Sequence, residues 1–161
     1  MTKLFIFFGL PGAGKTYVGK IAEKYFGYHL YEGDQDMSDD YKKAVVEETV
    51  NDELRQEFFD NLIERVNKLK EEKIVVTQTF IKEKFREQFL NTFPQAKFIL
   101  IEASFEIREK RLLNKNRFEL SLEKWQRMNK IFEKPQIPHE IIYNNDEGEE
   151  EVKKQLMKIV G

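Results

Sequence analysis

Residues 9–16 read Gly-Leu-Pro-Gly-Ala-Gly-Lys-Thr, which matches the pattern G-x-x-x-x-G-K-[ST] at every fixed position. Glycines at Gly9, Gly12 and Gly14 allow the backbone to take positive φ values and to come close to an anion. Successive N–H groups of such a loop point at phosphate oxygens, and a helix that follows adds its positive end. The stretch therefore predicts a phosphate-binding loop.

The residues on either side of this loop have the pattern that a phosphate-binding loop requires. The apolar, aromatic-rich run Lys3–Phe8 precedes it and indicates a buried strand. The segment Lys15–Phe26 has apolar residues at helical spacing and is closed by Gly27. A strand before the loop and a helix after it distinguish a true phosphate loop from a chance glycine-rich turn. We therefore expect the chain to bind a nucleoside triphosphate, and ATP first of all.

Each residue of the loop has an expected task. Lys15 is a catalytic candidate because it supplies positive charge to the β and γ phosphates. The hydroxyl of Thr16 is suited to Mg²⁺. The candidate nucleotide-binding residues are Gly9, Gly12, Ala13, Gly14, Lys15, Thr16 and Tyr17, together with Arg111 further along the chain.

Length and composition restrict the class of protein. A chain of 161 residues is the usual size of one domain, and we expect a single domain over residues 1–161. The absence of cysteine excludes disulfides, thiolate metal sites and a cysteine nucleophile. No apolar run approaches the length of a membrane span, so we expect a cytoplasmic protein, monomer or homodimer, without a membrane partner. The net charge of −2, with both signs interleaved, does not favour nucleic acid as a partner.

Short apolar runs alternate with helical patterns along the rest of the chain. Further strands are expected at Tyr28–Tyr31, Lys73–Thr77, Lys97–Ile101 and Glu140–Tyr143. The segments between them have apolar residues at helical spacing. Strands that alternate with helices predict an α/β fold, in which helices cover both faces of a five-stranded parallel sheet.

Asp34 lies just past the second expected strand, where open α/β sheets place ligand-binding groups. A carboxylate there can hold Mg²⁺ through water or accept a proton from an attacking hydroxyl. We therefore predict that Asp34 acts in metal binding, acceptor binding and catalysis. Glu32 and Asp36 are close enough in sequence to share this work, and a solvent-exposed acidic loop is the alternative.

Arg117 interrupts the helical pattern after the fourth expected strand. Arginine stabilises the charge that spreads over the oxygens of a transferring phosphoryl group, so we predict a catalytic role for Arg117. Arg111, on the preceding helix, is the expected partner of the nucleotide. The alternative for both is a solvated helix face, with arginines paired to glutamates such as Glu109.

Beyond these motifs, the chain resembles the small P-loop kinases of the gluconate kinase and shikimate kinase group, and it is closest to the gluconate kinases. The segment Thr16–Ala22, followed by Tyr28–Asp34, is similar to the opening of either family. Asn51–Arg55 resembles the Asn-Asp-x-x-Arg that opens the substrate-side helix of gluconate kinases. Phe85-Arg86 resembles their Tyr-Arg pair, and Lys82 falls on their lysine.

The resemblance implies a P-loop NTPase fold with strand order 2-3-1-4-5, a substrate-side helical segment at about residues 35–69 and a lid at about residues 114–120. It implies ATP and Mg²⁺ as cofactors. The implied reaction moves the γ-phosphoryl group to a hydroxyl of a small anionic acceptor, a gluconate- or shikimate-like sugar acid. Arg55, Lys82 and Arg86 become candidate acceptor-binding residues, because arginine can hold a carboxylate or phosphate with two hydrogen bonds.

Two departures from the family pattern affect the acceptor more than the ATP chemistry. Asn116-Arg117-Phe118 replaces the Gly-His-Phe of the lid, and Gln78–Ile81 replaces the Cys-Ser-Ala-Leu after the third strand. Two alternatives stay open. One is a polynucleotide 5′-hydroxyl or nucleotide kinase, which needs a basic groove. The other is an ATP-binding regulatory protein without phosphotransfer, in which nothing would depend on Asp34.

Overall fold

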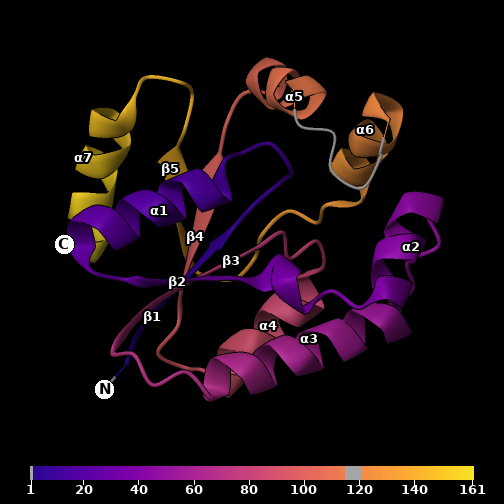
Figure 1. The fold of residues 1–161 in the computed structure, drawn as a ribbon, viewed down its shortest axis with the longest axis horizontal. Helices are drawn as coiled ribbons and strands as arrows, with labels where there is room; N and C mark the ends of the chain where they lie inside the picture. The colour runs from indigo at the N-terminus through magenta and orange to yellow at the C-terminus, as the bar shows by residue number, and fades with distance from the viewer. Residues whose placement is uncertain (1, 115–120) are drawn as a thin grey trace.

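The computed structural model describes residues 2–114 and 121–161, and its centre is a five-stranded sheet (Figure 1). The strands are β1 (Lys3–Phe8), β2 (His29–Glu32), β3 (Lys73–Gln78), β4 (Lys97–Glu102) and β5 (His139–Tyr143). All neighbouring pairs are parallel, and the order is β2-β3-β1-β4-β5. The fold class and strand order expected from the sequence are confirmed.

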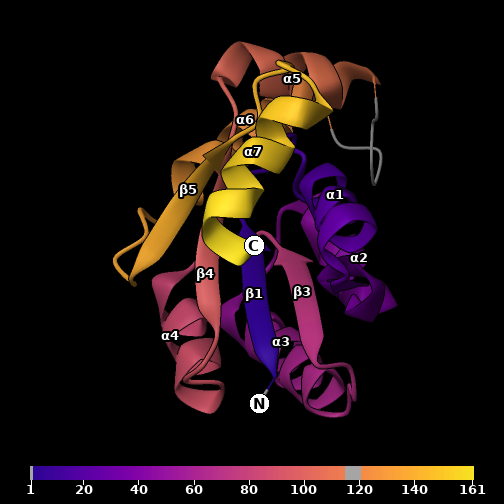
Figure 2. The same ribbon diagram turned by 90° about the vertical axis from the view of Figure 1, so that its left-hand side faces the viewer.

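Helices cover both faces of this sheet (Figures 1 and 2). One face carries α1 (Lys15–Phe26) and α7 (Glu149–Val160), and the other carries α3 (Asp52–Asn67) and α4 (Glu83–Thr92). The remaining elements lie towards the carboxyl ends of the strands: the 3₁₀ helix η1 (Gly33–Asp36), α2 (Asp39–Glu47), α5 (Phe105–Asn114) and α6 (Leu122–Ile131).

The two faces of β1 show why this sheet needs helices on both sides. Leu4, Ile6 and Phe8 belong to the apolar cluster that includes side chains of α3 and α4. Phe5 and Phe7 belong to the opposite cluster with α1 and α7. Because successive strand residues point to opposite faces, a strand that is buried on both faces reads as a continuous apolar run.

Local signals in the sequence place the helices around the carboxyl edge of the sheet. Gly14 (φ 87°) precedes α1 and Gly27 (φ 72°) ends it, and both have positive φ values that suit glycine. Ser38 caps α2 by accepting a hydrogen bond from the Tyr41 N–H at 3.1 Å. Asn51 caps α3 in the same way from the Leu54 N–H at 2.9 Å. Within the described residues, no helix is long and apolar enough to cross a membrane.

The resemblance also implies a substrate-side helical segment and a lid, and the structure describes the first of them. The helical segment at about residues 35–69 contains the end of η1, all of α2 and all of α3. The proposed lid at 114–120 lies outside the described residues, except for Asn114 at the end of α5. The predicted catalytic residue Arg117 also lies outside the described residues.

Candidate functional site

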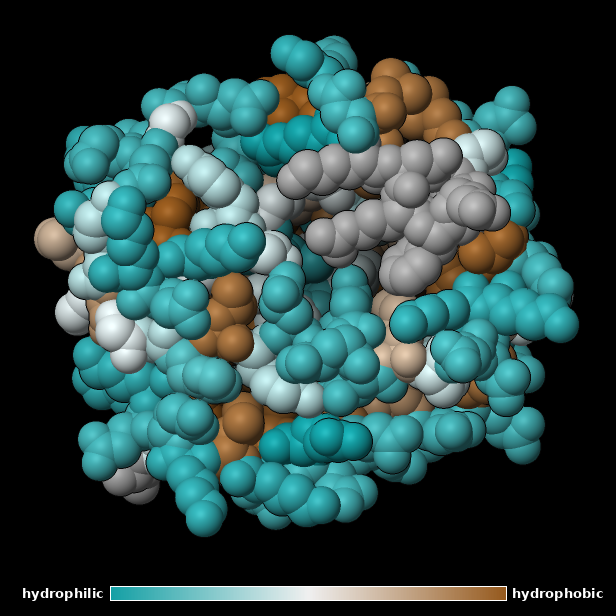
Figure 3. Space-filling model, in the orientation of Figure 1, coloured by the Kyte–Doolittle hydropathy of each residue, from teal (hydrophilic) through white to brown (hydrophobic). Residues whose placement is uncertain are grey.

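A cavity of about 1460 Å³ opens at the carboxyl ends of β1, β2 and β3. Its walls come from the phosphate loop, from η1 and α2, from the residues after β3, and from α5, α6 and the residues after β5. Figure 3 shows a mostly hydrophilic face that is hollowed near its centre. Of the sequence-predicted residues that are described, Lys15, Thr16, Tyr17, Asp34, Arg55, Lys82 and Arg111 all line this one cavity.

The backbone of the phosphate loop has little room for side chains. Gly9 has φ 147°, and a Cβ there would lie 2.5 Å from the carbonyl oxygen of Ile101. Gly12 has φ 84°, and its Cβ would lie 2.8 Å from the carbonyl oxygen of Arg108. The loop therefore depends on glycine for its path, and it leads directly into the N-terminus of α1, which favours a bound anion.

Lys15 places positive charge over this loop. Its Nζ donates hydrogen bonds to the carbonyl oxygens of Gly9, at 2.9 Å, and Leu10, at 3.2 Å. The ammonium group is thus folded back towards the start of the loop, next to the N-terminus of α1. A phosphate bound in this loop would meet the lysine charge and the helix dipole together.

Oxygen atoms suited to Mg²⁺ lie beside the phosphate loop. The hydroxyl of Thr16 donates to Glu32 Oε1 at 2.7 Å, and Asp34 follows two residues after Glu32 in η1. All three residues line the cavity. Among the described residues, no group of three or more His, Cys, Asp or Glu side chains could by itself hold a metal. This donor set fits Mg²⁺ bound largely through nucleotide phosphates and water, which is its usual mode.

Asp34 and Arg55 act on the same neighbour, Tyr41. Burial raises the pKa of the Tyr41 phenol, the Arg55 charge lowers it and the Asp34 charge raises it further. Both charges therefore lie close to one phenol group that lines the cavity. Asp34 from η1 and Arg55 from α3 thus line one cavity, beside the phenol on which both charges act.

Three buried polar atoms on the cavity wall have no hydrogen-bond partner: Arg55 Nε, Gln78 Oε1 and Trp125 Nε1. Arg55 makes one contact with a carboxylate, from its NH1 to Asp52 Oδ1 at 3.4 Å. An unpaired buried polar group costs free energy, so native proteins satisfy nearly all of them. All three atoms are out of reach of solvent, so a bound water or ligand could pair with them only after a shift of the side chains around them.

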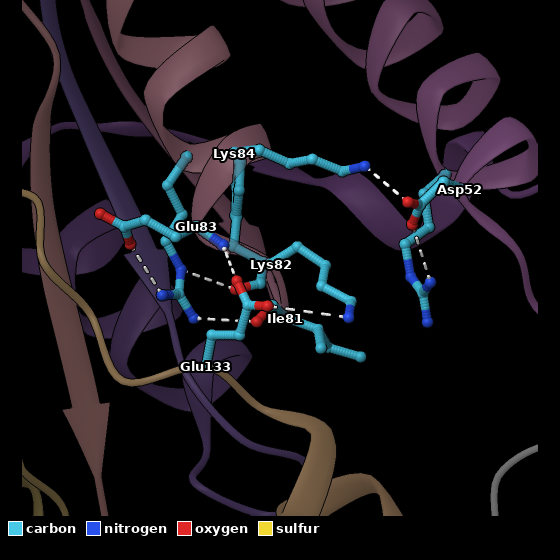
Figure 4. A network of polar contacts seen from close by, with 9 residues as sticks. Asp52, Ile81, Lys82, Glu83, Lys84 and Glu133 are labelled. Carbon is cyan, nitrogen blue, oxygen red and sulfur yellow. Dashed lines mark hydrogen bonds and ion pairs between the residues drawn. The ribbon is translucent and has the colours of Figure 1, made fainter.

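Lys82 lines the cavity and pairs with an acid that does not line it. Its Nζ lies 3.7 Å from Glu133 Oε2, and the other carboxylate oxygen of Glu133 accepts from the Glu83 N–H at 2.8 Å. The side chain of Lys82, the N-cap residue of α4, makes no capping hydrogen bond. Glu133 instead accepts the hydrogen bond from an N–H group in the first turn of this helix. Figure 4 shows Lys82, Glu133 and Glu83 in this network.

The structure does not place Arg86 in the cavity, contrary to the expectation that it binds the acceptor. Its side chain is fully buried, with 0% exposure. Its Nε donates to the Phe80 carbonyl at 2.8 Å, its NH2 to the Ile81 carbonyl at 3.3 Å and its NH1 to Glu83 Oε1 at 2.9 Å. The guanidinium also lies over the ring of Phe132, 4.8 Å from the ring centre. Arg86 is thus a structural residue that holds the loop after β3.

Arg111 contacts the phosphate loop. Its NH1 donates to the carbonyl oxygens of Gly12, at 2.9 Å, and Ala13, at 3.2 Å. Its NH2 donates to the Asn144 carbonyl at 2.7 Å and to Asp146 Oδ1 at 2.7 Å. Arg111 therefore supports the loop, and it also lines the cavity where the nucleotide is expected.

Sequence reasoning missed several residues of this site. Asn144 is 4% exposed and donates from Nδ2 to the Ala13 carbonyl at 2.9 Å, so it also supports the phosphate loop. The signal that could have found it is its position directly after β5, at the same sheet edge as the loop. Gln78 ends β3 at that edge and carries the same signal. Trp125 and Lys124 have no such signal, because helical spacing on α6 is equally typical of packing.

Comparisons with known proteins agree with this geometry. A family described as AAA domain matches residues 4–135. No curated protein matches the chain significantly.

Solved structures of kinases share the fold. A sugar kinase from Janibacter sp. HTCC2649 is 16% identical, with a TM-score of 0.80 over 98% of this chain and 94% of that chain. A gluconokinase from Sinorhizobium meliloti 1021 is 19% identical, with a TM-score of 0.76 over 97% and 92% of the two chains. A shikimate kinase from Acinetobacter baumannii in complex with shikimate is 14% identical, with a TM-score of 0.71 over 99% and 93%. At the level of the fold, these structures confirm the resemblance expected from the sequence.

Proposed function

This chain belongs to the family described as AAA domain, and we propose that it is an ATP-dependent kinase that phosphorylates a hydroxyl of a small anionic metabolite. The observation that carries the proposal is the shared cavity. A phosphate loop, a carboxylate after β2 and a buried arginine with an unpaired Nε all line it. The fold shared with a sugar kinase, a gluconokinase and a shikimate kinase supports the same reading.

In this proposal, the phosphates of ATP lie in the loop before α1. The backbone N–H groups of Gly12 to Thr16 surround them, and Lys15 neutralises charge on the β and γ phosphates. Mg²⁺, when bound with the nucleotide, would be held by Thr16 and, through water, by Glu32 and Asp34, and it would neutralise further charge. Arg111 and Asn144 keep the loop in shape from the other side.

Asp34 acts as the general base toward the acceptor hydroxyl. Its carboxylate accepts a hydrogen bond from the acceptor hydroxyl and takes the proton as the oxygen attacks the γ-phosphorus. Arg55 fixes the acceptor by its anionic group, and both residues line the same cavity. Lys82 adds a second positive charge from the loop before α4. Because transfer has little covalent chemistry, positioning of this kind provides much of the rate.

We expect ATP with Mg²⁺ to stabilise the wild-type protein in thermal unfolding, and the variant Lys15→Ala to lose most of that gain. A ligand at 100 times its Kd stabilises the native state by about 2.7 kcal/mol, and loss of affinity removes this term. Lys24→Ala is a matched control, because Lys24 is exposed on the same helix and does not line the cavity. Calorimetry that finds unchanged ATP affinity in Lys15→Ala would disprove the phosphate-loop assignment.

The variant Arg55→Lys is expected to raise the KM for the acceptor about tenfold or more, with a smaller effect on the KM for ATP. Lysine keeps the positive charge but cannot form the two parallel hydrogen bonds of a guanidinium. A hydrogen bond to a charged group contributes about 1.5–3 kcal/mol. The check is steady-state kinetics with acceptors that differ only in a carboxylate. Equal phosphorylation of the neutral and the acidic member of each pair would show that Arg55 does not select an anion.

A further inference from the structure

The part of the cavity away from the phosphate loop is lined by more cations than one carboxylate needs. The basic side chains there come from α2, α3, the residue before α4, and α6: Lys42, Arg55, Lys82, Lys124 and Arg127. Within the described residues, the acids that line the same part are Asp34 and Glu48. The local balance of charge is therefore positive, although the whole chain has a net charge of −2.

Two of these cations have acid partners that lie outside the cavity lining. Asp52 lies 3.4 Å from Arg55 NH1, and Glu133 lies 3.7 Å from Lys82 Nζ. Neither Asp52 nor Glu133 lines the cavity. Both acids are exposed to solvent outside the cavity, with side-chain exposures of 60% and 45%, and Figure 4 shows the contact of Glu133 with Lys82. A ligand inside the cavity therefore meets the positive groups and not these carboxylates.

Of the two acids that line this part, Glu48 is already paired. Glu48 binds Arg127 through both carboxylate oxygens, at 2.7 and 2.8 Å. Lys124, one helical turn before Met128 on the same helix, donates from Nζ to the backbone carbonyl of Val46. Within the described part of the chain, Lys124 forms no ion pair within 4.0 Å. Arg127 and, more weakly, Lys124 lower the pKa of the Glu48 carboxyl, so the Lys124 charge is only partly neutralised and still attracts an anion in the cavity.

Arg55 gives the clearest sign of a missing anion. A guanidinium has five N–H donors, and the single described hydrogen bond of the Arg55 side chain is the long one to Asp52. Its side chain is 11% exposed and its Nε has no partner. Trp125 Nε1, from α6, is a second unpaired donor on the wall of this cavity. Neither of these two atoms is reached by solvent, so a ligand could satisfy them only after the surrounding side chains shift. The NH2 group of Arg55 is not buried in this way and has no described partner, so it is the donor open to an anion in the cavity.

We propose that the acceptor is a phosphate monoester that carries a free hydroxyl, with its ester phosphate bound by Arg55, Lys82 and Lys124. This inference rests on the proposed kinase function and narrows its acceptor. A phosphate monoester has a charge of about −1.5 to −2 at neutral pH and three acceptor oxygens. A carboxylate has one charge and two oxygens, so it matches three cations on three elements less well.

The transfer step balances without a further reactant. The acceptor hydroxyl oxygen forms a bond to the γ-phosphorus of ATP, and the bond from that phosphorus to the β–γ bridging oxygen breaks. The hydroxyl proton passes to Asp34, and ADP leaves. The ester phosphate in the pocket is unchanged, so the product carries two phosphate esters.

The test compares matched ligands while the nucleotide site is filled. Calorimetry measures the affinities of sugar phosphates and of sugar acids with the same three to six carbons, with Mg²⁺ and a non-hydrolysable ATP analogue present in excess. The filled phosphate loop prevents the ester from binding there. We expect at least one phosphate ester to bind about tenfold tighter than its matched acid, because one extra charged hydrogen bond is of that size.

Two variants of α6 show whether the preference comes from this pocket. Lys124→Gln keeps a donor for the Val46 carbonyl but removes the charge, and it should reduce the preference for the ester to about twofold or less. Lys130→Ala is the control, because Lys130 is exposed on the same helix and does not line the cavity, and it should leave the preference unchanged.

Each outcome separates this inference from the function on which it rests. If acids bind as tightly as esters, or if the preference survives Lys124→Gln, the phosphate pocket is wrong while kinase activity on an acid can still hold. If a 5′-hydroxyl oligonucleotide binds tighter than every ester, the acceptor is a polynucleotide and the inference is overturned. If esters bind with the expected preference but none is phosphorylated from ATP, the pocket stands and the proposed kinase function fails.

Discussion

Replacement of Asp34 by asparagine is expected to lower kcat by about 10²- to 10⁴-fold, the usual contribution of a positioned general base. Asparagine has nearly the same shape and can still accept a hydrogen bond, but it cannot take a proton from the attacking hydroxyl. ATP affinity should change much less, because the phosphates are held mainly by the loop and Lys15. The measurement is kcat with the true acceptor, together with ATP affinity from calorimetry.

Asp36→Asn is a matched control for this variant. Asp36 belongs to the same 3₁₀ helix, but its Oδ2 accepts a hydrogen bond from the Tyr31 hydroxyl at 2.6 Å and it does not line the main cavity. Asparagine can accept the same bond, so kcat should stay near that of the wild type. If Asp34→Asn keeps full phosphotransfer, the base lies elsewhere, and Glu32→Gln becomes the next variant to measure. If no acceptor is phosphorylated even by the wild type, the chain is an ATP-binding protein without transfer.

The phosphate loop could be predicted from the sequence because its chemistry is local. Residues 9–16 are consecutive, and the strand and helix beside them have periodic apolar patterns. The strand order, by contrast, was implied by resemblance, since strand pairing depends on contacts between distant segments. The structure confirms that order and places Asp34 at the edge of the sheet where the loop also lies.

The wall of the acceptor pocket was harder to predict, for a physical reason. Arg55 and Arg86 both match basic positions of the resembled family, yet one lines the cavity and the other is buried in the core. Local spacing does not tell which way an arginine points when apolar surface surrounds it on several sides. Gln78, Asn144 and Trp125 come from three distant segments, and only packing of the whole chain brings them to one cavity.

Loss of the Arg86 guanidinium is expected to be the most destabilising change outside the apolar core. Arg86→Met keeps much of the side-chain volume but removes the partner of Glu83 and the donors to the Phe80 and Ile81 carbonyls. Glu83 is 15% exposed, so its charge would be left nearly buried. Removal of one partner from a buried ion pair costs about 3–5 kcal/mol. We expect a drop of that size in the free energy of unfolding, measured in urea.

Arg86→Lys and Glu87→Gln complete the comparison. Lysine keeps the charge but not the planar guanidinium with its several donors, so the loss of stability in Arg86→Lys should be intermediate. Arg86→Lys also remains measurable if Arg86→Met does not fold. Glu87 is an exposed neighbour on α4, and its change should stay within about 0.5 kcal/mol of the wild type. A loss below about 1 kcal/mol in Arg86→Met would contradict the structural role of Arg86.

Arg86 should also affect the acceptor site, because its hydrogen bonds hold the backbone of the loop after β3. Phe80 has φ 51°, a conformation that a bulky residue adopts only under strain of about 1–3 kcal/mol, and its carbonyl accepts from Arg86 Nε. Phe80, Ile81 and Lys82 line the cavity. If the loop relaxes in Arg86→Lys, the KM for the acceptor should rise while the affinity for ATP stays near that of the wild type. Equal losses for both ligands would point instead to a general loss of folded protein.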